Sequence, residues 1–239
     1  MGTENRPLKR VNSTKRRDRH LISIVTIGLI WAHSVYLGFD QAFRQDFTSS
    51  VPQFALYAGG YGLLSVMLVW GLLRIEGERF SDLGLETDRF GAQLGIGVLF
   101  GLGLFILHQA VLNPLADVVI SPTASSGVDL APLLSNPVYY PVWIGLALFK
   151  GGFEEEVWRV FALTRFEKRW GVSGLLFAIV VGSLVFGAGH FYQGADAVFT
   201  SSIKAALYSL IYLRKRRAME AMVAHAVYDI IGVTLFYLL

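Results

Sequence analysis

Long apolar stretches alternate with short polar segments along the whole chain. A helix needs about 20 mostly apolar residues to cross the roughly 30 Å hydrocarbon core of a bilayer. Seven stretches approach that length, without an internal repeat or a domain boundary between them. The pattern predicts an all-α polytopic membrane protein with about seven transmembrane helices. The predicted spans are Leu21–Leu37, Phe54–Leu73, Phe90–Leu112, Tyr140–Leu163, Val172–Gly189, Val198–Leu213 and Ala221–Leu239.

The composition supports a membrane protein. Hydrophobic residues make up 54% of the 239 residues, charged residues make up 16%, and the mean hydropathy is +0.50. An average soluble domain is about 45–50% apolar and about 25% charged, so an ordinary soluble enzyme is excluded. The absence of cysteine also excludes disulfides, thiol catalysis and thiolate-bound zinc.

The Lys and Arg residues predict the orientation, because cytoplasmic loops are enriched in them. Counted from the N-terminal tail through the six loops, they number 7, 1, 3, 0, 3, 0 and 4. This alternation puts the N-terminus inside, and it explains the net charge of +3 without a nucleic-acid partner. We expect residues 1–20 to form a basic, disordered cytoplasmic tail. Residues 21–239 are expected to form one transmembrane domain in the plasma (inner) membrane of a prokaryote.

Ionisable residues within the last four predicted spans mark a candidate site. Such residues are costly in hydrocarbon, and by default they indicate function. Interhelical ion pairs that only hold the bundle together are the structural alternative, but they would need only one or two pairs. The residues are Lys150, Glu154, Glu155, Glu156, Arg159, His190, Lys204, His225 and Asp229.

Helical spacing indicates how these side chains are arranged. Glu155 and Arg159 are four residues apart and are expected to pair, which leaves Glu154 free to face another group. Lys150 precedes Glu154 by four residues and is a competing partner. His225 and Asp229 are also four residues apart and share a face. We therefore predict that these acids and histidines converge on one water-filled pocket.

His190 needs a break in its helix to reach that pocket. At 1.5 Å per residue, a straight fifth span would carry His190 well beyond the depth of Glu154 and His225. Non-helical backbone is tolerated at membrane depth where it lines a wet cavity. We therefore expect residues 190–194 to form a buried turn.

These residue types allow two kinds of hydrolysis. A carboxylate and an imidazole beside one water form a general-base pair. Alternatively, Glu154, His190 and His225 could bind a divalent metal that activates the water. The residues alone leave both mechanisms open.

Three motifs on successive helices resemble a known family. Glu154-Glu155-x-x-x-Arg159, Phe186-x-x-x-His190 and His225-x-x-x-Asp229 are similar to the signature of the CAAX protease and bacteriocin-processing (CPBP, ABI) family. The resemblance covers about residues 140–232, the expected protease-like core. It implies an intramembrane endopeptidase related to the Ras-converting CAAX endopeptidase, with a peptide or membrane-protein substrate and no obligatory cofactor.

The resemblance also implies catalytic roles. Glu154 would be the general base, His190 would help it polarise water, and His225 and Asp229 would line the oxyanion side. Glu155 and Arg159 would be supporting residues. The family commonly has asparagine where this chain has Asp229, and an ionised aspartate would repel an oxyanion. Asp229 is therefore expected to be protonated, to orient His225, or to lie beside a metal.

Two other functional classes remain as alternatives. A non-proteolytic immunity or regulatory partner of the same family would keep the fold and lose a catalytic residue. A transporter or proton relay also uses intramembrane acids and histidines, but it is expected to show inverted repeats or broken helices in both halves. The clustering of ionisable residues in the second half favours the peptidase.

Overall fold

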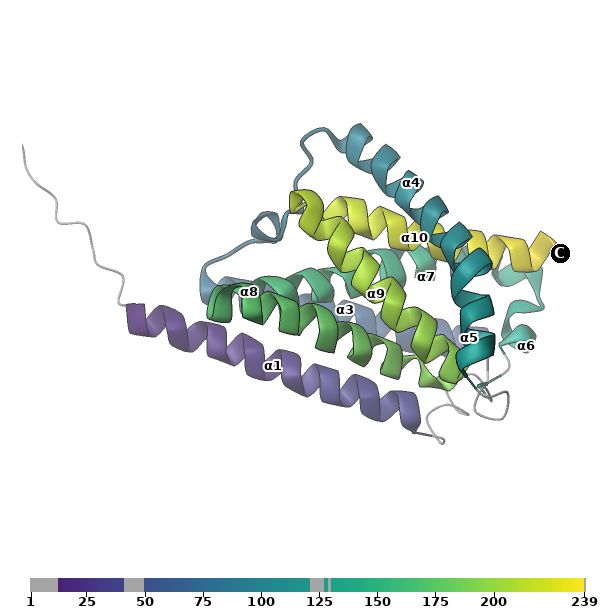
Figure 1. Ribbon diagram of the computed structural model, residues 1–239, viewed down its shortest axis with the longest axis horizontal. Coiled ribbons are helices and arrows are strands. Elements are labelled where there is room, and N and C mark those ends of the chain that lie inside the picture. Colours follow the sequence, from purple (N-terminus) through teal and green to yellow (C-terminus); the bar gives the residue numbers. More distant parts are fainter. Residues whose placement is uncertain (1–12, 41–49, 121–126, 129, 239) are drawn as a thin grey trace, which may run out of the picture.

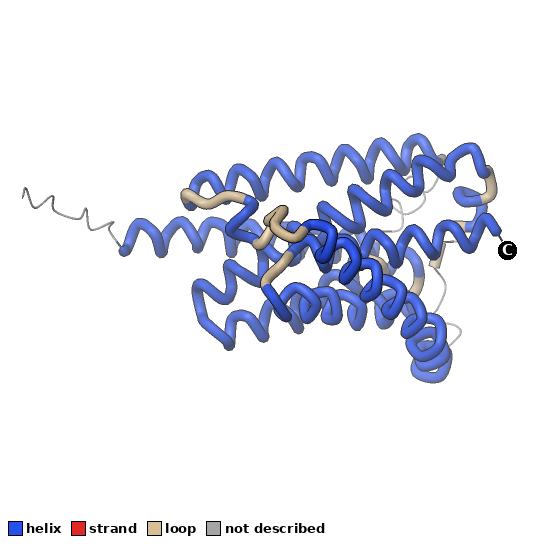
Figure 2. Tube along the Cα trace, turned by 90° about the horizontal axis from the view of Figure 1, so that it is seen from above, coloured by secondary structure: helices blue, strands red, loops and turns tan. Residues whose placement is uncertain are grey.

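The computed structural model describes residues 13–40, 50–120, 127–128 and 130–238. The described part of the chain is helical and contains no strand, as the apolar pattern predicts. Figure 1 shows long helices packed side by side, several of them running roughly along the longest axis of the molecule. Figure 2 shows the same bundle from above, with short loops between the helices.

The helices follow the predicted spans closely. The α-helices are α1 (Ser13–Phe39), α3 (Val51–Glu76), α4 (Phe90–Leu107), α5 (Asn113–Val119), α6 (Ala131–Leu134), α7 (Tyr140–Leu146), α8 (Glu156–Gly189), α9 (Ala195–Lys215) and α10 (Ala218–Leu238). Two π-helical segments, η2 (His108–Leu112) and η5 (Ala147–Glu155), continue α4 and α7. Three short 3₁₀ segments are η1 (Phe80–Leu83), η4 (Pro137–Tyr139) and η6 (Phe191–Gln193).

The N-terminal tail differs in part from its prediction. Helix α1 begins at Ser13, so residues 13–20 are helical and the expectation of disorder is wrong for them. This stretch lacks glycine and proline and is rich in Lys and Arg, which are good helix formers that let the apolar helix continue outward. The other residues of the predicted tail, 1–12, lie outside the described residues.

Helix α8 reverses direction at Gly171. This glycine has φ 63° and ψ −144°, a backbone conformation that residues with a Cβ rarely adopt. On either side of it the rings of Phe166 and Phe177 stack with centroids 5.2 Å apart, and the Arg159 guanidinium lies 4.6 Å from the Phe186 ring centroid. The two arms of α8 therefore pack against each other, which confirms the predicted separation of the fourth and fifth apolar stretches.

Among the residues that the structure describes, five helical segments are long and apolar enough to cross a membrane, which fits a polytopic membrane protein. They are His20–Phe39, Val51–Glu76, Phe90–Val119, Pro137–Gly189 and Ala218–Leu238. The fourth has 53 residues and contains the reversal at Gly171. Helix α9 is not one of the five segments found among the described residues. The number of seven crossings therefore stays a prediction.

The bundle is apolar outside and carries charges inside. Leu56, Leu99 and Val118 are 78%, 71% and 84% exposed, whereas Glu156 and Arg165 are fully buried. Large exposed apolar surfaces are unusual for monomeric proteins in water and are expected for a surface that contacts lipid. The interior charges are consequently held by partners within the protein.

Candidate active site

The glutamates lie at the end of the π-helical segment η5, which packs closely on α10. A Cβ on Gly151 would lie 2.3 Å from Asp229 Oδ2, and a Cβ on Gly152 would lie 2.7 Å from the Ala226 Cβ. The two glycines let the backbone that carries Glu154 approach α10. π-Helical turns inside helices occur frequently at functional sites.

Glu154 and Glu155 share one cation. Lys150 Nζ donates to Glu154 Oε2 at 2.5 Å and to Glu155 Oε1 at 2.8 Å. Lys150 therefore does compete for Glu154, as the spacing predicted. The side chain of Glu154 is 3% exposed and faces α3, where Ser65 interacts with its carboxylate, whereas that of Glu155 is 18% exposed.

The predicted pair of Glu155 and Arg159 is wrong. Arg159 Nε instead lies 3.0 Å from Glu156 Oε2, and the buried Glu156 also accepts a hydrogen bond from His225 Nδ1 at 2.8 Å. The prediction assumed α-helical spacing, whereas Glu155 lies in a segment with i→i+5 hydrogen bonds, which changes where its side chain points. Glu156, a residue without an assigned role in the sequence, thus anchors both Arg159 and His225.

Glu155 points toward the two histidines. Glu155 Oε2 lies 3.8 Å from His225 Nε2, and the Glu155 charge interacts with both His225 and His190. Asp229 Oδ2 lies on the other side of His225, 3.7 Å from the same Nε2. The structure therefore brings together Glu155, His225 and Asp229, with His190 close enough to interact with Glu155.

His190 lies in a turn, as its depth predicted. Helix α8 ends at Gly189, His190 follows with φ −93° and ψ 8°, and η6 begins at Phe191. His190 Nδ1 lies 2.7 Å from the carbonyl oxygen of Phe186. Because a carbonyl oxygen only accepts, Nδ1 carries the hydrogen, and in the neutral ring Nε2 remains an acceptor.

A cavity of about 220 Å³ opens beside these residues. Its polar wall contains Lys150, Glu154, Glu155 and His190, and its apolar wall includes Trp31 of α1. The described residues that line it do not include His225 or Asp229, which contact Glu155 from the α10 side. A water in the cavity would meet Glu154, Glu155 and His190.

Several residues of the site carry no recognisable signal in the sequence. Trp31 and Tyr61 line the cavity from α1 and α3, and Tyr208 of α9 stacks on the His225 ring with centroids 4.4 Å apart. Aromatic residues are common in apolar helices. Neither spacing nor charge distinguishes these three from lipid-facing neighbours.

A family comparison agrees with this geometry. Residues 136–231 match the family model described as type II CAAX prenyl endopeptidase Rce1-like. This segment is therefore similar to the CAAX protease family. No curated protein and no solved structure matches the chain significantly.

The matched segment contains all three motifs. Glu154, His190, His225 and Asp229 lie within it, whereas α1, α3 and α4 precede it. This similarity and the apolar helices support a peptidase in an integral membrane protein, with a peptide or a membrane protein as substrate.

The glycine pair Gly151 and Gly152 offers a test of the site geometry. We expect Gly151→Ala to lower peptide hydrolysis at least tenfold with little loss of stability, because the new methyl group displaces only the end of the Asp229 side chain. Gly152→Ala is the matched control. Its methyl group would meet the Ala226 Cβ and the Met222 carbonyl oxygen, so it should lower thermal stability instead. Similar stability losses in both variants would contradict this account.

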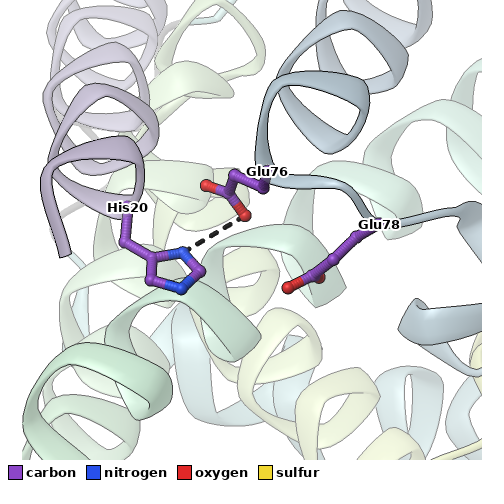
Figure 3. Close-up of side chains that lie close together, drawn as sticks. All are labelled: His20, Glu76 and Glu78. Carbon is purple, nitrogen blue, oxygen red and sulfur yellow. Dashed lines mark ion pairs between the residues drawn. The ribbon is translucent and has the colours of Figure 1, made fainter. Parts of the chain in front are cut away.

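A second polar cluster lies at the far end of α3 from the cavity. Figure 3 shows His20, Glu76 and Glu78, with His20 Nδ1 3.2 Å from Glu76 Oε2. Among the described residues, this is the one group of three metal-ligand side chains whose donor atoms lie within 4.8 Å of one another. The alternative ligand set Glu154, His190 and His225 does not meet that distance.

The cluster already contains cations of its own. Arg165 Nη1 lies 2.7 Å from Glu76 Oε2, Arg165 Nη2 lies 2.8 Å from Glu78 Oε2, and Lys168 also pairs with Glu78. Burial raises the pKa of Glu78, but hydrogen bonds from Arg165 and Lys168 outweigh burial, so this pKa lies below its usual range. The arrangement is that of an ion-pair cluster joining α1, α3 and α8.

Proposed function

We propose that the protein is an intramembrane endopeptidase in which a glutamate and His190 activate a water for attack on a peptide bond. The observation that supports this most directly is that Glu155 and His190 line one cavity while His225 contacts Glu155 from behind. A carboxylate and an imidazole within reach of one water are the components of general-base hydrolysis.

The sequence motif assigns the base to Glu154, and the contacts favour Glu155. Glu154 lines the cavity, but its side chain is only 3% exposed and its carboxylate is held by Lys150 and α3. Glu155 is more exposed to the cavity and is the glutamate that contacts His225. We therefore propose Glu155 as the base, with Glu154 fixing Lys150 beside it.

The proposed reaction consumes one water and leaves Glu155 deprotonated again at its end. Glu155 takes a proton from the water, whose oxygen bonds to the peptide carbonyl carbon, and the carbonyl oxygen becomes an oxyanion. The carbon–nitrogen bond then breaks, and Glu155 gives the proton to the departing amine. His190 Nε2 accepts a hydrogen bond from the water and holds it in line with the carbonyl carbon.

His225 and Asp229 are proposed to support Glu155 from the α10 side. A proton on His225 Nε2 would lie between Glu155 Oε2 and Asp229 Oδ2, where it would orient the Glu155 carboxylate. Glu156 holds the other ring nitrogen, and Arg159 holds Glu156. Glu156 and Arg159 are therefore proposed as positioning residues.

We further propose that the protein acts in the plasma membrane of a prokaryote with its N-terminus in the cytoplasm. The alternating Lys and Arg content of the loops supports this orientation. The apolar outer surface supports direct contact with the lipid bilayer.

Chelation tests the proposed mechanism. We expect purified protein in liposomes to cleave quenched fluorescent peptides with aliphatic residues around the scissile bond, at the same rate with and without EDTA. A metal-activated water would instead require that EDTA abolish cleavage and that added zinc restore it. Loss and restoration of this kind would contradict the metal-independent mechanism. If no folded preparation cleaves any of the peptides, with or without zinc, the proposed function itself is contradicted.

A further inference from the structure

Helix α1 supplies part of the apolar wall of the cavity. Ile30, Trp31 and Leu37 line the cavity, together with Ser34. Spacings of three and four residues place these side chains on one face of the helix. Helix α1 is far in sequence from the motif residues, yet it lines the same cavity as Glu155.

Trp31 is the largest of these side chains, and it is held on two sides. Its ring stacks on the Phe166 ring, with centroids 5.5 Å apart and 7° between the ring planes. A Cβ on Gly182 would lie 3.2 Å from Trp31 Cζ2, so the glycine lets the indole lie directly against α8. The indole therefore fixes the width of the cavity at this point.

Helix α1 also meets the turn that carries His190. A Cβ on Gly189 would lie 2.6 Å from Ser34 Oγ, and Gly189 immediately precedes His190. Ser34 follows Trp31 by three residues, a rise of about 4.5 Å along the helix. Trp31 is thus about one helical turn from the point where α1 meets the residue proposed to hold the water.

The volume of the cavity limits what can enter. An apolar cavity of about 150 Å³ binds benzene, and one water occupies about 30 Å³ of liquid. A volume of about 220 Å³ therefore holds one group of about the size of benzene together with about two waters. Because the hydrolytic water needs part of this space, only one substrate side chain fits.

We infer that Trp31 is a specificity-determining residue that limits the one substrate side chain in the cavity to an apolar group of about the size of leucine or phenylalanine. This inference rests on the proposed function, because it places that side chain next to the bond that is hydrolysed. A side chain with two fused rings would meet the indole, which Phe166 and the backbone at Gly182 hold in place.

Pairs of quenched fluorescent peptides test the inference. The two peptides of a pair carry leucine or naphthylalanine, which has two fused rings, at one of the two residues that flank the scissile bond. At one of these positions, we expect the wild type in liposomes to have an at least tenfold higher kcat/KM for leucine, because overfilling an apolar pocket is costly. Trp31→Ala should lower this ratio at least tenfold by making room for the second ring. An unchanged ratio at both positions in the folded variant would overturn the inference.

Three further variants separate the size of the cavity from general damage. Trp70→Ala is the matched control and should leave the ratio unchanged, because Trp70 is 53% exposed and is not among the described residues that line the cavity. Trp31→Phe keeps a ring beside Phe166 and should shift the ratio in the same direction by less, and it replaces Trp31→Ala if that variant fails to fold. Gly182→Ala adds a methyl group to the cavity beside the indole and should raise the preference for leucine.

A binding measurement distinguishes failure of this inference from failure of the proposed function. The Glu155→Gln protein in detergent is expected to bind the same peptides without cleaving them, and fluorescence anisotropy of labelled peptides gives each Kd. Adding Trp31→Ala should lower the Kd for naphthylalanine relative to leucine at least tenfold. If this shift occurs but the wild type cleaves neither peptide, the pocket is supported and the proposed function fails. If the wild type cleaves the leucine peptide and Trp31→Ala changes neither ratio, only the inference about Trp31 fails.

Discussion

Replacing Glu155 by glutamine is expected to lower peptide hydrolysis by about 10²–10⁴-fold, the usual loss when a general base is removed. Glutamine keeps the volume and one acceptor oxygen, but it cannot take the proton from water. Lys150 would still pair with Glu154, and Arg159 would still pair with Glu156, so the protein should fold. Single-turnover cleavage of the quenched fluorescent peptides by purified variant and wild type measures the effect.

Glu154→Gln is the matched control, because it removes the neighbouring carboxylate from the same lysine. We expect a smaller loss, since Glu154 is nearly buried and its contacts are with Lys150 and α3. An inactive Glu154 variant beside an active Glu155 variant would restore the assignment made from the motif. Full activity of both variants would contradict a glutamate-dependent peptidase.

Much of the fold could be predicted because lipid imposes a simple pattern. A membrane-crossing helix must be apolar over most of its length, and this requirement predicted most of the helices and a break between residues 163 and 172, without placing it at Gly171. Helix α9 is harder to recognise as a membrane span, because Lys204 and several hydroxyl side chains lower its hydropathy. Some of these hydroxyl side chains are buried within the protein. The start of α1 at Ser13 was missed because charge alone does not prevent a helix from continuing.

The candidate site could be predicted as a set of residues but not as a set of pairs. The motifs gave Glu155, His225 and Asp229, which do lie together. Their partners depended on η5, whose π-helical hydrogen bonds are not recognisable from spacing rules for α-helices. The pairing of Arg159 with Glu156 follows from that geometry.

Arg165 shows the same limit at the far end of the bundle. Arg165 is one of the three basic residues counted in the predicted fourth loop on the cytoplasmic side, yet its side chain is 0% exposed. The loop lies within a continuous helix, and the reversal comes later, at Gly171. The loop charges that indicate orientation thus include one that supports the fold.

Arg165→Met is therefore expected to destabilise the protein by about 3–5 kcal/mol, the usual cost of removing one partner from a buried ion pair. Methionine fills much of the space but leaves Glu76, whose side chain is 1% exposed, without its guanidinium. Ser23 donates to the other oxygen of Glu76 and cannot neutralise the charge. The contacts between α8, α3 and α1 should weaken together, and thermal unfolding in detergent followed by circular dichroism measures the change.

Lys168→Met removes the same charge from the same cluster and is the control. The Lys168 side chain is 38% exposed, so its pair with Glu78 should contribute only about 0–1 kcal/mol. The lowered pKa of Glu78 adds stability that is present at neutral pH and lost as the pH falls through the folded-state pKa. Acid should therefore narrow the difference in stability between the wild type and the Arg165 variant. Equal destabilisation by the two substitutions at neutral pH would show that burial of Arg165 does not determine the stability of this cluster.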